Sequence, residues 1–316
     1  MIRKEYVVGG VILLTAVIIG CMQVQKDREE SPFQDKNLLK KGMDKPVVWI
    51  YVNNGDVNSR SWADFMSRSS RVMNLPFLNL CYQTISKFTA KHYRIEVIGG
   101  LQDLAVRMGG WEALPTPLQT PDAFVREPEL NWIRAAVLAK WGGLWVSPAS
   151  ICVDEVPALP KDKIVFFGTD ADETFAKSTS LPSFNVVWAP KGGLNFWVEW
   201  ERRARMRLET RAGGAEFTQE HKVDFETMLQ KYGQGDVEIR VKAEISRKGA
   251  ALRRIQLEDL LAAYTDDIVM NDGLYVPIPY PEILERETFG WFLRMSEDQI
   301  LDSDMVISHL FREVIA

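Results

Sequence analysis

Apolar and polar residues along this chain fall into alternating strand-like runs and helical stripes. The run 46–53 is continuously apolar and rich in β-branched and aromatic residues, which predicts a buried strand. Residues 76–92 begin at a proline and carry apolar side chains at helical spacing, which predicts a helix. Residues 93–100 alternate and end in glycines, which predicts a second strand. A helix is also expected over 61–74.

The clearest helical pattern is "PELNWIRAAVLAKWGG", and its double glycine marks the helix end. Strands are predicted at 144–147, 163–169 and 184–190, and helices at 193–211 and 256–264. The alternation of strands and helices predicts an α/β domain with a mostly parallel sheet flanked by helices. Ligands of such sheets bind beyond the carboxyl ends of the strands, so the loops after strands are the places to search for chemistry.

The N-terminus predicts a membrane anchor. Arg3 and Lys4 precede an uncharged run over residues 6–25, which is just long enough to span a bilayer. We therefore expect an anchor at 1–25 with a cytoplasmic N-terminus, in a membrane of the endoplasmic reticulum, the Golgi or a cell envelope. The alternatives are a lipoprotein anchored at Cys21 and a cleaved signal peptide. A charged stalk over 26–45 and one domain over 46–316 complete the expected organisation.

Composition excludes some classes of function. The formal net charge of −5 gives no general attraction to nucleic acid, so we expect no nucleic-acid partner. Three scattered cysteines and three histidines argue against a disulfide framework or a zinc site. The basic run over 201–211 also contains acids, which favours a solvated, salt-bridged helix face over an anion-binding surface.

Three segments in order carry a resemblance to a known family: "KPVVWIYVNNGD", "LCYQTISKFTAKHYRIEVIG" and "ELNWIRAAVLAKWGGLWVS". They resemble the DXD-type glycosyltransferases of capsular polysaccharide synthesis and their mannosyltransferase-like relatives, over roughly residues 46–200. The resemblance implies a GT-A fold, a UDP- or GDP-sugar donor and a glycan or glycoprotein acceptor. It also implies Mn²⁺ or Mg²⁺ held by the DXD acids, which would neutralise the diphosphate leaving group.

This chain departs from the family at the acids. Asn131 stands where the family helix usually has Asp, whereas Arg134 is retained. Ser147-Pro148-Ala149 stands in place of the DXD motif. Asp170 and Asp172, in "GTDADE", could supply substitute metal ligands, although this segment is also typical of an exposed acidic loop. Metal dependence is therefore doubtful, and a metal-independent enzyme would need Arg or Lys to stabilise the diphosphate.

The donor-binding candidates lie after the predicted strands or carry the resemblance. Their alternatives are ordinary structural roles: turn formation, helix capping for Asn131 and an ion pair for Arg134. Tyr51 is the candidate for base stacking. The candidates are Tyr51, Asn53, Asp103, Asn131, Arg134, Ser147, Ser150 and Asn185.

Two functions follow from this pattern. The first is a membrane-anchored glycosyltransferase, transferring a sugar from a nucleotide-sugar donor to a glycan or protein acceptor. The second is a catalytically inactive, glycosyltransferase-derived binding or structural protein, because neutral residues at acid positions are what a loss of catalysis would leave. The two differ in whether carboxylates lie close to Ser147.

Overall fold

A computed structural model describes most of the chain after residue 44. The described residues are 45–53, 75–169, 181–191, 195–210, 217–232, 236–249, 253–265, 268 and 273–315. The predicted anchor over 6–25, the alternative at Cys21 and the helix expected over 61–74 lie outside them. Residues Pro46–Ala316 form one compact unit. Within the described part of the chain, no helix combines the length and apolarity that crossing a bilayer requires.

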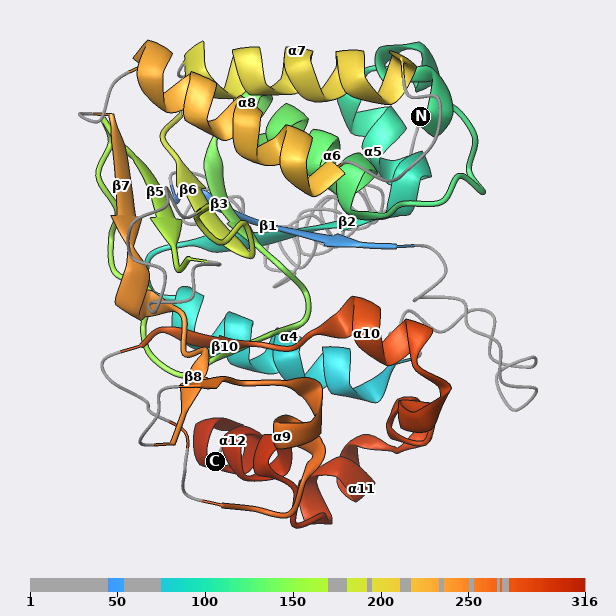
Figure 1. Cartoon of the computed structure of the whole chain (residues 1–316), viewed down its shortest axis with the longest axis vertical. Helices are drawn as coiled ribbons and strands as arrows, with labels where there is room; N and C mark the ends of the chain where they lie inside the picture. Colours follow the sequence, from blue (N-terminus) through green and yellow to red (C-terminus); the bar gives the residue numbers. More distant parts are fainter. Residues whose placement is uncertain are drawn as a thin grey trace, which may run out of the picture. The chain divides into compact units, whose positions relative to one another are not determined.

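A six-stranded sheet in the order β2-β1-β3-β6-β5-β7 forms the centre of this unit (Figure 1). Its strands are β1 (Val47–Val52), β2 (Arg94–Gly99), β3 (Gly143–Val146), β5 (Ile164–Phe167), β6 (Val186–Ala189) and β7 (Val237–Arg240). Strand β6 runs antiparallel to β3 and β5, and the other pairings are parallel. The predicted mostly parallel α/β sheet is therefore confirmed.

Strand β1 is continuously apolar because both faces of the sheet are covered. Val48, Ile50 and Val52 belong to the core cluster on one face, and Trp49 and Tyr51 to the cluster on the other. All five side chains are less than 5% exposed. Burial on both faces is the usual reason that a strand of a parallel sheet lacks alternation.

Four helices cover the face that carries Trp49: α5 (Gly100–Met108), α6 (Glu127–Trp141), α7 (Asn195–Thr210) and α8 (Phe217–Tyr232). Two short 3-10 turns, η2 (Trp111–Ala113) and η3 (Thr116–Leu118), connect α5 to α6. Helix α8 was not predicted from the sequence, although Phe225 and Met228 carry its buried apolar stripe.

The double glycine between α6 and β3 is required by close backbone contacts. Gly142 and Gly143 have φ of +63° and +105°. A Cβ on Gly142 would lie 2.7 Å from the Pro190 carbonyl oxygen, and one on Gly143 would lie 2.5 Å from that of Val47. Both positions therefore combine a backbone conformation and a proximity that only glycine tolerates. The indole of Trp49 donates to the Gly142 carbonyl at 2.7 Å and fixes the turn against β1.

The opposite face is covered by α4 (Pro76–Thr89) and by a small sheet of β4 (Ser150–Cys152) and β10 (Tyr275–Pro277). The C-terminal part packs on the outer side of α4 through a second apolar cluster. Its elements are η5 (Val241–Ala243), β8 (Arg247–Lys248), β9 (Arg253–Arg254), α9 (Leu257–Leu261), α10 (Tyr280–Glu285), η6 (Glu287–Phe289), η7 (Phe292–Arg294), α11 (Glu297–Asp302) and α12 (Val306–Ile315). Helix α9 is shorter than the predicted 256–264.

Candidate functional site

The connections around β1 place a topological switch point at the carboxyl edge of the sheet. The chain leaves β1 through α4 on one face to β2, and leaves β2 through α5 and α6 on the other face to β3. Because β3 pairs with the other side of β1, the carboxyl ends of β1 and β3 meet where the strand order reverses. Such a switch point is where open α/β sheets bind ligands.

The turn after β3 is held from two sides. The Ser147 amide donates to the Asn185 carbonyl at 2.7 Å, and the Ile278 amide donates to the Ala149 carbonyl at 2.9 Å. Ser150 is fully buried, and its Oγ has no hydrogen-bond partner among the described residues. The structure thus brings Ser147, Ser150 and Asn185 together beside the switch point.

The side chains of this turn do not suit a divalent cation. Mn²⁺ and Mg²⁺ prefer carboxylate oxygens, whereas Ser147 offers a hydroxyl and Ala149 a methyl group. Asp170 and Asp172, the possible substitutes, lie outside the described residues. Across the part of the chain that the structure describes, there is no cluster of three or more His, Cys, Asp or Glu side chains able to hold a metal. The described turn therefore does not fit the family's metal.

Arg134 is a core residue, 3% exposed. Its Nη1 donates to the Phe184 carbonyl at 2.7 Å, and its guanidinium lies over the Phe184 and Trp145 rings at 4.9 and 6.0 Å. Phe184 directly precedes Asn185, so Arg134 holds the segment that enters β6. Its contact with a donor phosphate stays a prediction.

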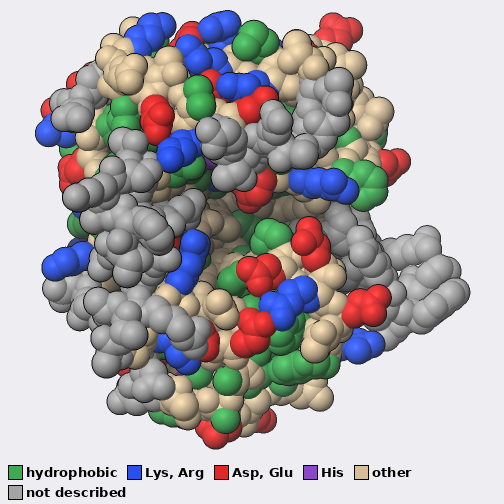
Figure 2. All heavy atoms as spheres, in the orientation of Figure 1, with side chains coloured by type: hydrophobic (Ala, Val, Ile, Leu, Met, Phe, Trp, Pro, Cys, Tyr) green, Lys and Arg blue, Asp and Glu red, His purple; other side chains and the backbone are tan. Residues whose placement is uncertain are grey.

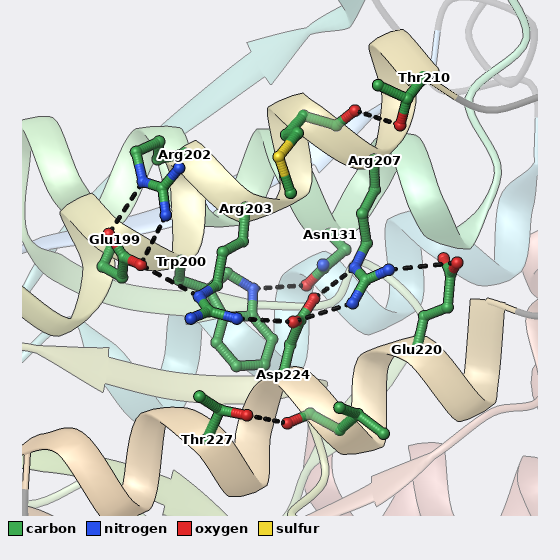
Figure 3. A network of polar contacts seen from close by, with 12 residues as sticks. Asn131, Glu199, Trp200, Arg202, Arg203, Arg207, Thr210, Glu220, Asp224 and Thr227 are labelled. Carbon is green, nitrogen blue, oxygen red and sulfur yellow. Dashed lines mark hydrogen bonds and ion pairs between the residues drawn. The ribbon is translucent and has the colours of Figure 1, made fainter.

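Asn131 is likewise engaged inside the protein. Its Oδ1 accepts from the Trp200 indole at 3.0 Å, which joins α6 to α7 (Figure 3). Asn131 is the fifth residue of α6, whose N-cap is Arg126. The capping role considered for Asn131 is therefore wrong, and the contact with a sugar is untested.

The remaining candidates lie at the ends of β1 and β2. Tyr51 is 3% exposed and packs in the core with Trp49, so base stacking would require a ring exposure that the structure does not show. Asn53 directly follows β1 and is half-buried. Asp103 accepts from the Gly99 amide at 3.1 Å and pairs with Arg107 at 3.1 Å, which is a local role at the start of α5. Their donor contacts remain predictions.

A buried polar cluster at the carboxyl end of β5 was missed by sequence reasoning. The Tyr275 hydroxyl lies 2.6 Å from the Phe167 carbonyl oxygen and 2.7 Å from the Glu244 carboxyl. Glu244 is only 6% exposed. Gly168 has φ +109°, and a Cβ there would lie 2.6 Å from Glu244 Oε2. A glutamate in an otherwise unremarkable loop gave no local signal, because the contact spans distant parts of the chain.

Helices α7 and α8 are joined by the ion-pair network in Figure 3. Asp224 on α8 is bonded by Arg203 at 3.1 Å and by Arg207 at 2.9 Å. Glu199 pairs with Arg202, and the hydrogen bond from Arg202 is the main reason that the pKa of Glu199 is lowered to about 2. The predicted salt-bridged helix face is confirmed over residues 201–210. Figure 2 accordingly shows red and blue side chains interspersed over this part, and a hollowed surface between α8 and α10.

His221 on α8 lies against the segment that Arg134 holds. Its ring centroid is 4.5 Å from that of Phe184 and 5.2 Å from that of Trp200. Burial, followed by the charge of Arg134, lowers the pKa of His221 to about 3. The imidazole is therefore neutral at physiological pH.

The sequence matches no family model and no curated protein. Its fold is similar to the crystal structure of a glycosyltransferase involved in the glycosylation of the major capsid of PBCV-1. That match has 10% identity and a TM-score of 0.37, and covers 74% of this chain and 95% of the other. It is also similar to the apo form of the glycosyltransferase GlyE of Streptococcus pneumoniae TIGR4, with 8% identity and a TM-score of 0.31. This match covers 62% of the chain and 44% of GlyE. Similarity at this level leaves function to be inferred from the site.

Proposed function

We propose that this chain is a glycosyltransferase of GT-A type that binds a nucleotide-sugar at the carboxyl ends of β1 and β3. The switch point between these strands carries the proposal. It is flanked by Asn53, Ser147 and Asn185, which offer neutral hydrogen-bonding groups to a nucleotide or sugar, and Ser150 is buried behind the same turn. The sequence resemblance independently assigns the same loops to the donor. A UDP- or GDP-sugar donor and a glycan or glycoprotein acceptor are the partners that this resemblance supports.

Arg134 supports the proposed site through the buried backbone next to it. Its hydrogen bond to the Phe184 carbonyl fixes the residue before Asn185, and Asn185 in turn accepts from the Ser147 amide. Arg134 is thus a positioning residue for the turn that replaces the acidic motif. A direct contact with the diphosphate would require Arg134 to move out of the core and to break its hydrogen bond to the Phe184 carbonyl. Separating a buried charge from its partners is strongly disfavoured.

A second candidate is a nucleotide-sugar or glycan-binding protein without catalysis. The observation that favours it is the side-chain set of the turn, with a hydroxyl at Ser147 and a methyl group at Ala149 in place of two carboxylates. Such a protein would bind a donor without transferring the sugar.

Calorimetry on the full chain with UDP- and GDP-sugars, with and without manganese, tests the proposal. We expect binding of one donor class, reduced at least tenfold in Asn185→Ala, with Asn79→Ala as a control that removes an amide bonded to Glu297 on α11. Binding without release of free nucleotide in a coupled assay with candidate acceptors supports the second candidate. No binding of any donor in either condition would overturn the glycosyltransferase proposal and the nucleotide-sugar-binding form of the second candidate.

A further inference from the structure

The short segment that enters β6 is held from both faces of the central sheet. On one face, Phe184 belongs to the core cluster beside α6, and its carbonyl accepts from Arg134. On the other face, the Ser183 hydroxyl lies 3.4 Å from the hydroxyl of Tyr275, which belongs to the opposite core cluster. The residue that follows, Asn185, is therefore preceded by two fixed positions.

A row of hydrogen bonds leads from Asn185 to a buried carboxyl group. The Asn185 amide donates to the Ser183 hydroxyl at 3.4 Å, and that hydroxyl can donate to the Tyr275 oxygen. The Tyr275 hydroxyl lies 2.7 Å from the Glu244 carboxyl and shares its hydrogen with the Phe167 carbonyl oxygen at 2.6 Å. Each hydroxyl in the row accepts one hydrogen and donates another, so the bonds strengthen one another.

The backbone gives Glu244 a second contact with the same segment. The Ser183 amide donates to the Gly168 carbonyl at 3.1 Å, directly after β5. An added Cβ on Gly168 would lie 2.6 Å from Glu244 Oε2, so the carboxyl group packs against this glycine. Glu244 therefore reaches the entry to β6 through a side-chain route and through a backbone route.

Burial of this carboxyl group is not what stability alone would favour. Glu244 is 6% exposed and Tyr275 is 1% exposed. Apolar side chains of similar volume often stabilise a core as well as buried charged groups do. A polar acceptor is needed, however, to give the row of hydrogen bonds its direction. The row ends at Asn185, whose own carbonyl accepts from the Ser147 amide at 2.7 Å, in the turn of the proposed donor site.

We propose that Glu244 is a positioning residue of the donor site, acting through Tyr275 and Ser183 on the backbone at Asn185. This inference rests on the proposed function and adds a residue that sets the geometry of the same site. In this role Glu244 does not touch the donor. It fixes the direction in which Asn185 faces the nucleotide-sugar, so its loss weakens donor binding without removing a donor contact.

Calorimetry on the full chain with UDP-glucose and GDP-mannose, in manganese and in EDTA, tests this role. Tyr275→Phe keeps the ring but removes the hydroxyl that joins Glu244 to Ser183, and we expect donor affinity to fall at least about fivefold. Glu244→Ala should lower it at least about tenfold. Glu244→Gln keeps an oxygen that can accept from Tyr275, so its affinity should stay within about threefold of the wild type.

The matched control is Tyr93→Phe, which also removes a tyrosine hydroxyl from a buried ring. Tyr93 precedes β2 at the opposite edge of the sheet, and its hydroxyl donates to the Pro157 carbonyl at 2.6 Å. This variant should bind the donor as the wild type does.

Hydrogen exchange measured by mass spectrometry follows the same effect without a donor. In Tyr275→Phe, exchange in a peptide covering residues 181–189 should speed up at least about tenfold, and in Tyr93→Phe it should not change.

The outcomes separate this inference from the proposed function. If Asn185→Ala weakens donor binding but Tyr275→Phe and Glu244→Ala bind as the wild type does, the inference is wrong and the donor site stands. Equal losses in Tyr93→Phe and Tyr275→Phe also overturn it, because affinity then follows stability alone. Unchanged exchange over 181–189 in Tyr275→Phe has the same meaning. If the wild type binds neither donor in either condition, the proposed function fails and the inference falls with it.

Discussion

The half-buried His221 predicts a measurable pH dependence of stability. Burial, followed by the charge of Arg134, lowers the pKa of its imidazole from 6.5 to about 3. The unfolded chain therefore binds a proton at this residue at a higher pH than the folded chain. The stability that the neutral ring contributes is complete above pH 6.5 and is lost progressively as the pH falls from 6.5 toward 3.

The loss of unfolding free energy at pH 5 depends little on the pKa of His221 in the folded state. On going from pH 7.5 to pH 5 the pH passes the ordinary histidine pKa of 6.5 and ends 1.5 units below it. The histidine of the unfolded chain therefore becomes protonated, while folded His221 stays neutral. At about 1.4 kcal/mol for each unit, the free energy of unfolding falls by about 2 kcal/mol. Most carboxylates titrate below this interval, so they contribute little to the change.

The assay is urea unfolding of the full chain at pH 7.5 and pH 5, followed by tryptophan fluorescence. His221→Phe is the reference variant, because phenylalanine keeps a ring against Phe184 and Trp200 and cannot titrate. We expect the wild type to lose about 2 kcal/mol more than the variant between the two pH values. Equal losses in the two proteins would refute the reasoning and show that His221 is hydrated or paired when protonated.

Three further substitutions test the packing around the site, each by urea unfolding. Gly168→Ala should destabilise by more than about 2 kcal/mol, because the added Cβ would meet the buried Glu244 carboxyl. The control Gly109→Ala has nearly the same positive φ, but no atom lies within 4 Å of its added Cβ, so it should lose only about 1 kcal/mol. Asp224→Asn should destabilise by about 2–4 kcal/mol, because Arg203 and Arg207 then lose the carboxylate that they share. Glu220 is more exposed, so Glu220→Gln should change stability by less than about 1 kcal/mol. Asn131→Ala leaves a buried indole N–H without its acceptor and should lose about 1–3 kcal/mol. Equal effects of the two glycine or the two acid substitutions would contradict these assignments.

The central elements could be predicted because their signals are local. The run Val47–Val52 is apolar at every position, which reflects burial on both faces, and the double glycine after α6 marks a turn where a side chain would clash. The antiparallel direction of β6 could not be predicted, because the apolar run Val186–Ala189 is the same for either direction. Strand β4 is only three residues long and pairs with Tyr275–Pro277, so no local pattern could reveal it.

The environment of single polar residues was harder to predict. Arg134 was expected to reach a phosphate or an acid, yet its described hydrogen bond goes to a carbonyl 50 residues away in the chain. Asn131 accepts a hydrogen bond from an indole 69 residues away in the chain. Spacing along a helix shows which face a residue occupies, but the partner on that face comes from tertiary packing. The residue types were therefore informative, whereas the assigned roles depended on contacts that the sequence does not display.

The C-terminal third changes how the proposed site should be understood. The sequence of this part resembles nothing recognisable, yet its strand β10 lies between the turn that carries Ser150 and the loop that carries Glu244. Pro277 lies opposite Ser150 in the β4–β10 ladder, and the Ile278 amide donates to the Ala149 carbonyl, so the C-terminal third fixes the backbone of the turn that stands in place of the acidic motif. The geometry of the proposed donor site therefore depends on a part of the chain that the sequence resemblance does not reach.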